Sequence, residues 1–226
     1  MTGADHAAAA DQEVVPSVRA QLLATEHWSL LASRSTTQNE LLVRIAIFLT
    51  LVSASVVSLA LIGQATDFDG RFDAFATVLF SILLLVGSLT LLRVINGSAE
   101  DAAYVIGMNR LRAAYAELDP GIDRYFITSK HDDDRGVGQT YTFFAPTSDE
   151  RQLFASSTMF ILVVDAVVAG TLAGLVAKAV DGSGAVIAIA AAAAGTSYFV
   201  AIMWFVLRRI RGEWSRYIAL FPHPEE

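Results

Sequence analysis

One carboxylate, Asp165, lies inside an apolar stretch that runs from Ser157 to Val180. The stretch is long enough to cross a bilayer as a helix, because about 20 residues at a rise of about 1.5 Å each cover the hydrocarbon core. An aspartate near the bilayer centre costs about 2.5 to 3.5 kcal/mol on insertion scales, so it faces a bundle interior, pairs with another group or takes up a proton. Two interpretations of Asp165 stay open: a buried, hydrogen-bonded packing residue, and a group that takes part in ion or proton passage.

Four other polar residues in apolar stretches are candidate partners of Asp165. Counting residues from the same end of each stretch places Thr50, Ser88 and Tyr198 roughly 10 to 13 Å deep, close to the depth of Asp165. Arg44 lies nearer the end of its stretch, and its long side chain could reach down and neutralise the carboxylate. We therefore predict an intramembrane polar layer formed by these residues.

Small residues predict how two of the apolar stretches pack. Gly170 and Gly174 form a GxxxG step, and an alanine-rich run in the last stretch is followed by Gly195. Small residues let helix backbones approach closely in lipid. Because only residues 181–183 join the two stretches, we predict a closely packed antiparallel hairpin.

The segment His131-Asp132-Asp133-Asp134 has the residue types of a metal site but not the spacing. A calcium loop needs glycine at its sixth position and glutamate at its twelfth, and the segment meets neither requirement. We interpret it as a solvated acidic loop. The other histidines lack zinc-ligand spacing, and the chain carries no nucleophile elbow, phosphate loop or dinucleotide fingerprint, so we expect no enzyme activity, no metal and no cofactor.

The composition is that of a membrane protein. Of 226 residues, 54% are hydrophobic and only 17% are charged, which is too apolar for a soluble domain of this length. The net charge of −7 averages acidic polar segments with basic flanks, and it gives no reason to expect a nucleic-acid partner. The absence of cysteine excludes disulfides and thiolate chemistry.

Four apolar stretches predict an all-α, polytopic membrane protein built from two antiparallel transmembrane hairpins in a lipid bilayer. The predicted spans are residues 41–63, 74–95, 157–180 and 184–207. The chain is expected to divide into a disordered tail (1–16), a cytoplasmic amphipathic helix (17–40), a first hairpin (41–95), a cytoplasmic helical region (96–156), a second hairpin (157–207) and a basic cytoplasmic C-terminus (208–226).

The distribution of basic residues predicts the orientation. One side of the predicted spans has only Arg71 and Lys178. The other side has Arg34, Arg44, Arg93, Arg110, Arg112, Arg151, Arg208, Arg209, Arg211 and Arg216. Because basic residues near span ends favour the cytoplasmic side, both termini are predicted to be cytoplasmic, with the protein in a cell inner membrane.

Two helices are predicted outside the bilayer. The first is expected to break at residues 33–37 and to restart near Gln38, because Thr37 and Glu40 have the spacing of a capping box. The second continues out of the second span to Leu118, before Pro120-Gly121. Its apolar positions form one stripe that needs a partner, which makes the stripe the predicted surface for homo-oligomer assembly or for a cytoplasmic protein partner. The stripe comprises Tyr104, Met108, Leu111, Tyr115 and Leu118.

Three segments give the chain a resemblance to known proteins. Residues 26–32 (EHWSLLA), residues 108–112 (MNRLR) and the stretch from Tyr125-Phe126 to His131-Asp132-Asp133 resemble a family of uncharacterised bacterial four-span membrane proteins. This likeness covers most of the chain and implies no assigned activity. The order of helix, hairpin and helix over residues 17–118 is also similar in layout to SLATT-type two-span effectors, which are proposed to form pores. The second hairpin departs from that layout.

Two functional hypotheses follow. The first is a homo-oligomeric channel or pore, indicated by Asp165, by the apolar stripe and by the hydroxyl-rich first span. The serines of that span have the alternative of bonding back to their own helix. The second hypothesis is a non-conducting membrane scaffold or sensor whose cytoplasmic helical region binds a protein partner.

Overall fold

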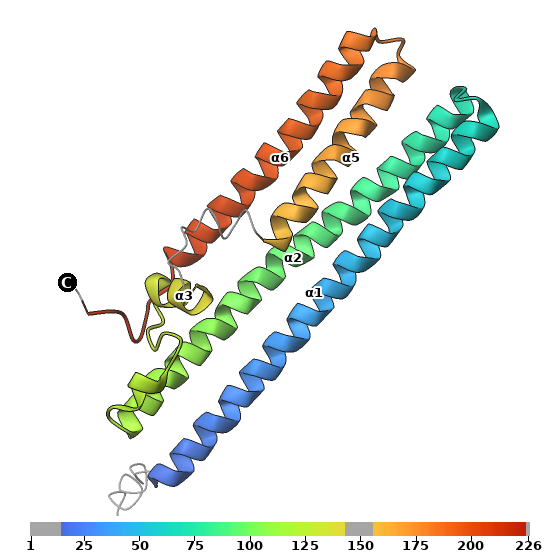
Figure 1. The fold of residues 1–226 in the computed structure, drawn as a ribbon. Helices are drawn as coiled ribbons and strands as arrows, with labels where there is room; N and C mark the ends of the chain where they lie inside the picture. Colours follow the sequence, from blue (N-terminus) through green and yellow to red (C-terminus); the bar gives the residue numbers. More distant parts are fainter. Residues whose placement is uncertain (1–14, 143–155, 225–226) are drawn as a thin grey trace, which may run out of the picture. The chain divides into compact units, whose positions relative to one another are not determined.

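The computed structural model describes residues 15–142 and 156–224 (Figure 1). The regular structure among these residues is entirely helical, which confirms the predicted all-α class. Residues 1–14 of the predicted disordered tail and residues 143–155 of the predicted cytoplasmic region lie outside the described residues.

Four helices are long and apolar enough to cross a membrane. They are α1 (Pro16–Thr66), α2 (Gly70–Leu118), α5 (Ser157–Ala179) and α6 (Gly184–Trp214). Each covers one of the four predicted spans, although α5 ends one residue before the predicted end of the third span at residue 180. Large apolar side chains such as Ile47, Leu85 and Ile189 are more than half exposed on these helices, as expected where lipid rather than protein covers the surface. The chain is a multi-pass membrane protein by these criteria.

The predicted break in the first helix is wrong, because α1 runs without interruption from Pro16 to Thr66. Thr37 is a buried position inside the helix and not an N-cap. Contacts with α2 stabilise the helix here: Gln38 Nε2 donates to Asp101 Oδ1 at 2.9 Å, and Arg93 Nη2 donates to Glu40 Oε2 at 3.0 Å. Tertiary contacts of this kind override a weak local preference against helix in a run of serine and threonine.

The second predicted helix is confirmed, since α2 continues from its apolar part to Leu118 without a break. Gly121 follows in the left-handed conformation (φ 102°), which glycine adopts readily and which redirects the chain. A short 3₁₀ helix, η1 (Ile122–Tyr125), comes next. The segment after it contains α3 (Asp134–Tyr141), with Asp133 as its N-cap, where no helix was predicted.

Two tight connections make the hairpins. Between α1 and α2, Asp67 and Phe68 have positive φ angles, and Gly63 leaves room for the Phe68 ring, which a side chain at position 63 would overlap. Between α5 and α6, Asp181 has a φ of 58° and Ser183 caps α6 by accepting from the Val186 N–H. Both hairpins have the antiparallel connectivity that the sequence predicted.

The described chain divides into two compact units, and the boundaries between them fall inside α1 and α2. We call residues 36–101 and 156–217 the membrane unit, because they contain the apolar spans. We call residues 15–35, 102–142 and 218–224 the polar unit.

The core of the membrane unit is formed by all four long helices. Phe48 of α1, Leu91 of α2, Ile161 and Leu162 of α5 and Val206 of α6 belong to one buried cluster. Because Phe48, Ile161 and Leu162 are fully buried, they fix which faces of their helices point inward. Tyr198 also packs against this core.

Candidate functional site

Asp165 lies in the interior of the membrane unit, with its side chain fully buried. Its Oδ2 accepts a hydrogen bond from the Tyr198 hydroxyl at 3.2 Å, and the Tyr198 oxygen lies 2.9 Å from Ser88 Oγ. Since Tyr198 donates to the carboxylate, Ser88 is left to donate to Tyr198. The structure thus brings together three of the predicted polar residues in a hydrogen-bonded chain from three helices.

One oxygen of Asp165 has no hydrogen-bond partner among the described residues. This atom, Oδ1, lies directly against Gly87, and a side chain at position 87 would overlap both the carboxylate and the Phe48 ring. Gly87 and Phe48 were not predicted as neighbours of Asp165. A glycine next to Ser88 at the same depth was the available signal, because a missing side chain leaves room for a polar group on a facing helix.

The structure does not bring Thr50 or Arg44 to Asp165. Thr50 is exposed, and its hydroxyl donates to the carbonyl of Ala46 at 2.8 Å in its own helix. Arg44 donates to Glu40 at 2.9 Å, one turn earlier in α1. Thr50 lies at the depth of Asp165 but not beside it, because Phe48 occupies the buried face of α1.

The other hydroxyls of the first span also bond within α1. Ser53 donates to the carbonyl of Leu49 and Ser58 to that of Ala54, each at 2.9 Å. Back-bonding of this kind satisfies a hydroxyl in lipid without any water-filled path. The hydroxyl-rich first span therefore does not by itself support a pore.

The small residues of the second hairpin pack as predicted. A Cβ atom at Gly170 would lie 2.7 Å from the Ala191 carbonyl oxygen, and a Cβ atom at Gly195 would lie 2.8 Å from that of Ala166. At these two positions only glycine allows the backbones to come so close. Gly174 differs, because a Cβ atom there would make only an ordinary contact, 3.5 Å from Ala191 Cβ.

The predicted stripe on α2 is covered within the chain. Met108 and Leu111 are buried, and the Tyr115 ring stacks on His27 of α1 with ring centroids 6.1 Å apart. Leu30 of α1 packs so closely over α2 that a Cβ atom at Gly107 would lie 2.9 Å from its Cδ1. Tyr104 and Leu118, the other two members, are half-buried. The first part of α1 therefore covers the stripe that was predicted to bind a second copy or another protein.

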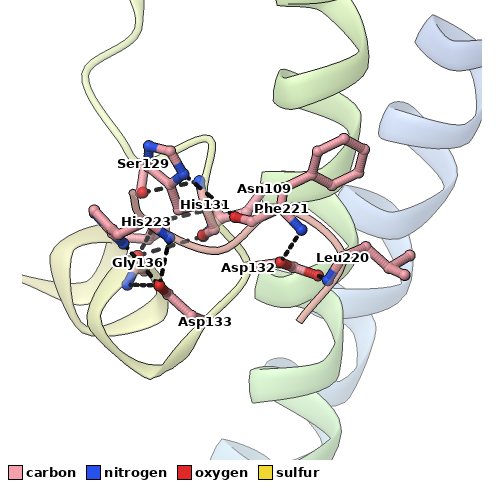
Figure 2. A network of polar contacts seen from close by, with 10 residues as sticks. Asn109, Ser129, His131, Asp132, Asp133, Gly136, Leu220, Phe221 and His223 are labelled. Carbon is pink, nitrogen blue, oxygen red and sulfur yellow. Dashed lines mark hydrogen bonds and ion pairs between the residues drawn. The ribbon is translucent and has the colours of Figure 1, made fainter. Parts of the chain in front are cut away.

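A second polar site lies in the polar unit, where the C-terminal segment 218–224 docks against the segment before α3 (Figure 2). The fully buried carboxylate of Asp132 accepts from the backbone N–H groups of Leu220 at 3.0 Å and Phe221 at 2.8 Å. It also pairs with Arg110 at 2.8 Å. In return, the Asp132 N–H donates to the carbonyl of Phe221 at 3.3 Å.

Asp133 and the two histidines complete this site. The Asp133 carboxylate accepts from the His223 backbone N–H at 2.8 Å, lies 2.9 Å from His223 Nδ1, and caps α3 through the Gly136 N–H. Burial works to raise the pKa of Asp133, but the hydrogen bonds from His223 and Gly136 outweigh it and hold that pKa below its usual value. The ring centroids of His131 and His223 lie 4.0 Å apart. Figure 2 shows both residues in this site.

Asn109 of α2 positions the segment against which the C-terminal segment docks. Its buried amide donates to the His131 carbonyl at 2.8 Å and to the Gly136 carbonyl at 3.3 Å. Its Oδ1 accepts from Arg112 at 2.7 Å and from Thr140 at 3.0 Å. The prediction of a solvated acidic loop is therefore wrong for Asp132 and Asp133. The N-cap role of Asp133 had a local sequence signal, because aspartate is common just before a helix. The contact with the C-terminal segment had no such signal in the sequence.

No protein-family model, curated protein or solved structure matches this chain.

Proposed function

We propose that this integral membrane protein is a non-conducting, non-enzymatic scaffold or sensor whose polar unit binds an extended peptide segment of a partner. The binding site is the one that the chain's own C-terminal segment now occupies. The bias of basic residues supports a cytoplasmic location for this unit and for both termini. Membership of the bacterial four-span family that the sequence resembles, and an inner-membrane location, are parts of the same proposal.

The capture of the segment's backbone by Asp132 and Asp133 supports this role. Three backbone N–H groups, those of Leu220, Phe221 and His223, donate to the two carboxylates. Because main-chain groups make these contacts, another extended segment could form them with different side chains. Leu220 and Ile218 are 64% and 82% exposed, so the docked segment uses little of its apolar surface for binding.

The burial of Asp132 favours exchange of the docked segment for another over its simple release. If the segment left without replacement, the carboxylate would lose two donors in a buried place, at a cost of about 1 to 3 kcal/mol or more. A competing segment that supplies the same donors removes that cost. A partner peptide is therefore the natural trigger for releasing the C-terminal segment.

Binding of a synthetic peptide tests the proposal. A fluorescent peptide with the sequence of residues 218–226 should bind saturably to the chain truncated after Tyr217. It should bind much more weakly to the full chain, because the tethered segment competes at an effective concentration of about millimolar. Fluorescence anisotropy with detergent-solubilised protein measures both affinities.

Variants that remove the same charge distinguish peptide binding at this site from non-specific electrostatic attraction of the peptide. Asp132→Asn in the truncated chain should weaken peptide binding at least about tenfold, because charge-assisted hydrogen bonds are roughly twice as strong as neutral ones. Asp119→Asn removes the same charge at an exposed position and should leave the affinity unchanged. Equal binding by both variants, or no binding to the truncated chain, would contradict the proposal.

A homo-oligomeric channel or pore is the second candidate, and Asp165 is the observation that favours it. A buried carboxylate with one unpartnered oxygen inside the membrane unit is the kind of group that ion and proton pathways use. Liposomes containing the full chain decide between the two functions. Ion or proton flux that Asp165→Asn abolishes would support the channel, and the mass of the protein–detergent complex would give the number of copies.

A further inference from the structure

Basic residues in the membrane unit fall into two groups. Five of them form ion pairs with carboxylates at 2.8 to 3.0 Å: Arg44, Arg71, Arg93, Lys178 and Arg209. Three others, Arg208, Arg211 and Arg216, are exposed and have no carboxylate partner among the described residues. Arg208 and Arg211 lie in the last two turns of α6, and Arg216 lies just beyond its end. Unneutralised positive charge is therefore concentrated at one place in this unit.

Two of these arginines share a helix face with an exposed aromatic ring. Arg208 and Arg211 follow Trp204 by four and seven residues, which places all three on one side of α6. The Arg208 guanidinium lies over the Trp204 ring, 5.0 Å from its centroid, and the ring itself is 59% exposed. Arg209 points elsewhere and donates to Asn96 Oδ1 at 2.6 Å.

The surroundings of this face are those of a lipid interface. No residue in the apolar window of α6 is buried within the chain, so lipid is available to contact this helix. Arg208 lies about 6 Å beyond Trp204 along the helix axis, toward the polar end. Trp214 and Tyr217, whose rings meet edge to face at 5.6 Å, are residue types that favour the headgroup level.

We propose that Arg208, Arg211 and Arg216 form a binding surface for the phosphate groups of anionic phospholipids, with the acyl chains against Trp204. The planar guanidinium group presents paired donors that match two phosphate oxygens. The other arginines of the same unit each pair with a carboxylate, which offsets their positive charge. The surface therefore retains anionic lipid beside α6 in preference to zwitterionic lipid.

Quenching of Trp204 by brominated lipid tests this directly. Trp28→Phe and Trp214→Phe leave Trp204 as the sole tryptophan of the full chain. The protein is reconstituted in phosphatidylcholine with a minor fraction of phosphatidylglycerol, and bromine is placed on the acyl chains of either the phosphatidylglycerol or an equal fraction of the phosphatidylcholine. Bromine on phosphatidylglycerol should quench Trp204 several-fold more strongly.

Matched variants identify the residues responsible. Arg208→Gln with Arg211→Gln should abolish the difference between the two lipids, and the corresponding lysine variants should keep part of it. Arg44→Gln with Arg71→Gln removes the same charge from paired positions and should keep it in full. Equal quenching by the two lipids, or a preference that survives Arg208→Gln with Arg211→Gln, would overturn the proposal. Loss of the preference in millimolar inorganic phosphate would also overturn it, in favour of a free-phosphate site.

Discussion

At the scale of single residues, Asp165 has a definite environment. Tyr198 donates to one of its oxygens, Ser88 extends the chain of hydroxyls, and Gly87 lies directly against the other oxygen. The absence of a side chain at position 87 is what allows the carboxylate to enter the interior of the membrane unit. The position of the Asp165 carboxylate therefore depends on glycine at position 87.

Gly87→Ala should destabilise the membrane unit by about 1 to 3 kcal/mol, because a new methyl group must overlap the carboxylate and the Phe48 ring. Thermal unfolding in detergent measures the effect. Gly212→Ala provides the control, since nothing lies within 4 Å of its added Cβ, and it should be neutral or slightly stabilising. Adding Asp165→Ala to Gly87→Ala should restore part of the lost stability. A double variant less stable than Gly87→Ala alone would argue against this overlap.

His27 is a titratable residue of the polar unit whose surroundings disfavour protonation. Its ring stacks on Tyr115, and its buried Nδ1 has no hydrogen-bond partner among the described residues. Burial, and secondarily the positive charge of Arg112, lower the pKa of His27. Protonation of His27 is therefore less favourable in the folded chain than in the unfolded chain.

Acidification should weaken the polar unit through His27. Because the pKa of His27 is lower in the folded state, the stability it contributes is fully present above the usual value of 6.5 and is lost as the pH falls below it. Thermal unfolding followed by Trp28 fluorescence, with the other tryptophans replaced by phenylalanine, should show a lower midpoint at pH 5.5 than at pH 7.5. His27→Phe keeps the ring stacking and should flatten this dependence. An unchanged pH dependence in His27→Phe would assign it to other groups.

At the scale of elements, the second hairpin depends on two glycines more than on a motif. Gly170 and Gly195 lie where the backbones of α5 and α6 approach most closely. Gly174 completes the GxxxG spacing in the sequence, yet its surroundings have room for a methyl group. The motif therefore marks the correct helix face but not the residues that need to be glycine.

Gly170→Ala and Gly174→Ala should separate these roles. The first places a methyl group 2.7 Å from the Ala191 carbonyl oxygen and should lower the midpoint of thermal unfolding by several degrees. The second should leave the midpoint unchanged or raise it slightly, since alanine favours helix over glycine. The same detergent assay measures both variants. A larger loss for Gly174→Ala than for Gly170→Ala would mean that the closest approach of the helices lies elsewhere.

At the scale of the whole molecule, the chain combines a membrane unit and a polar unit that share α1 and α2. The C-terminal segment joins the polar unit although it follows the last span in sequence. The three polar residues of the intramembrane chain find hydrogen-bond partners at least 33 residues away in the sequence. Asp132 and Asp133 bind the backbone of the C-terminal segment 88 to 90 residues away. Both polar sites therefore form only when segments far apart in the sequence come together in the folded chain.

Cysteine labelling tests the proposed orientation of the chain. The protein has no cysteine of its own, so each introduced cysteine is the sole reactive site. Ile127→Cys and Pro224→Cys should react with an impermeant maleimide only when the cytoplasmic face is accessible, as in inverted vesicles. Gln64→Cys and Val180→Cys, at the ends of the predicted spans with Arg71 and Lys178, should react in right-side-out vesicles. Labelling of all four positions from the same side would contradict the predicted topology.

The sequence by itself determined the helical class, the four spans and the close packing of the second hairpin, because hydrophobicity and residue size act locally and repeat along a helix. It also placed Ser88 and Tyr198 at the depth of Asp165, since depth follows from counting residues along a rigid helix. Only the tertiary structure decided which side of each helix faces inward. That choice turned Thr50 and Arg44 away, enclosed Asp165 against Gly87, and covered the stripe around Met108 with α1. It also carried the C-terminal segment to Asp132, a contact between residues that have no periodic or local relation in the sequence.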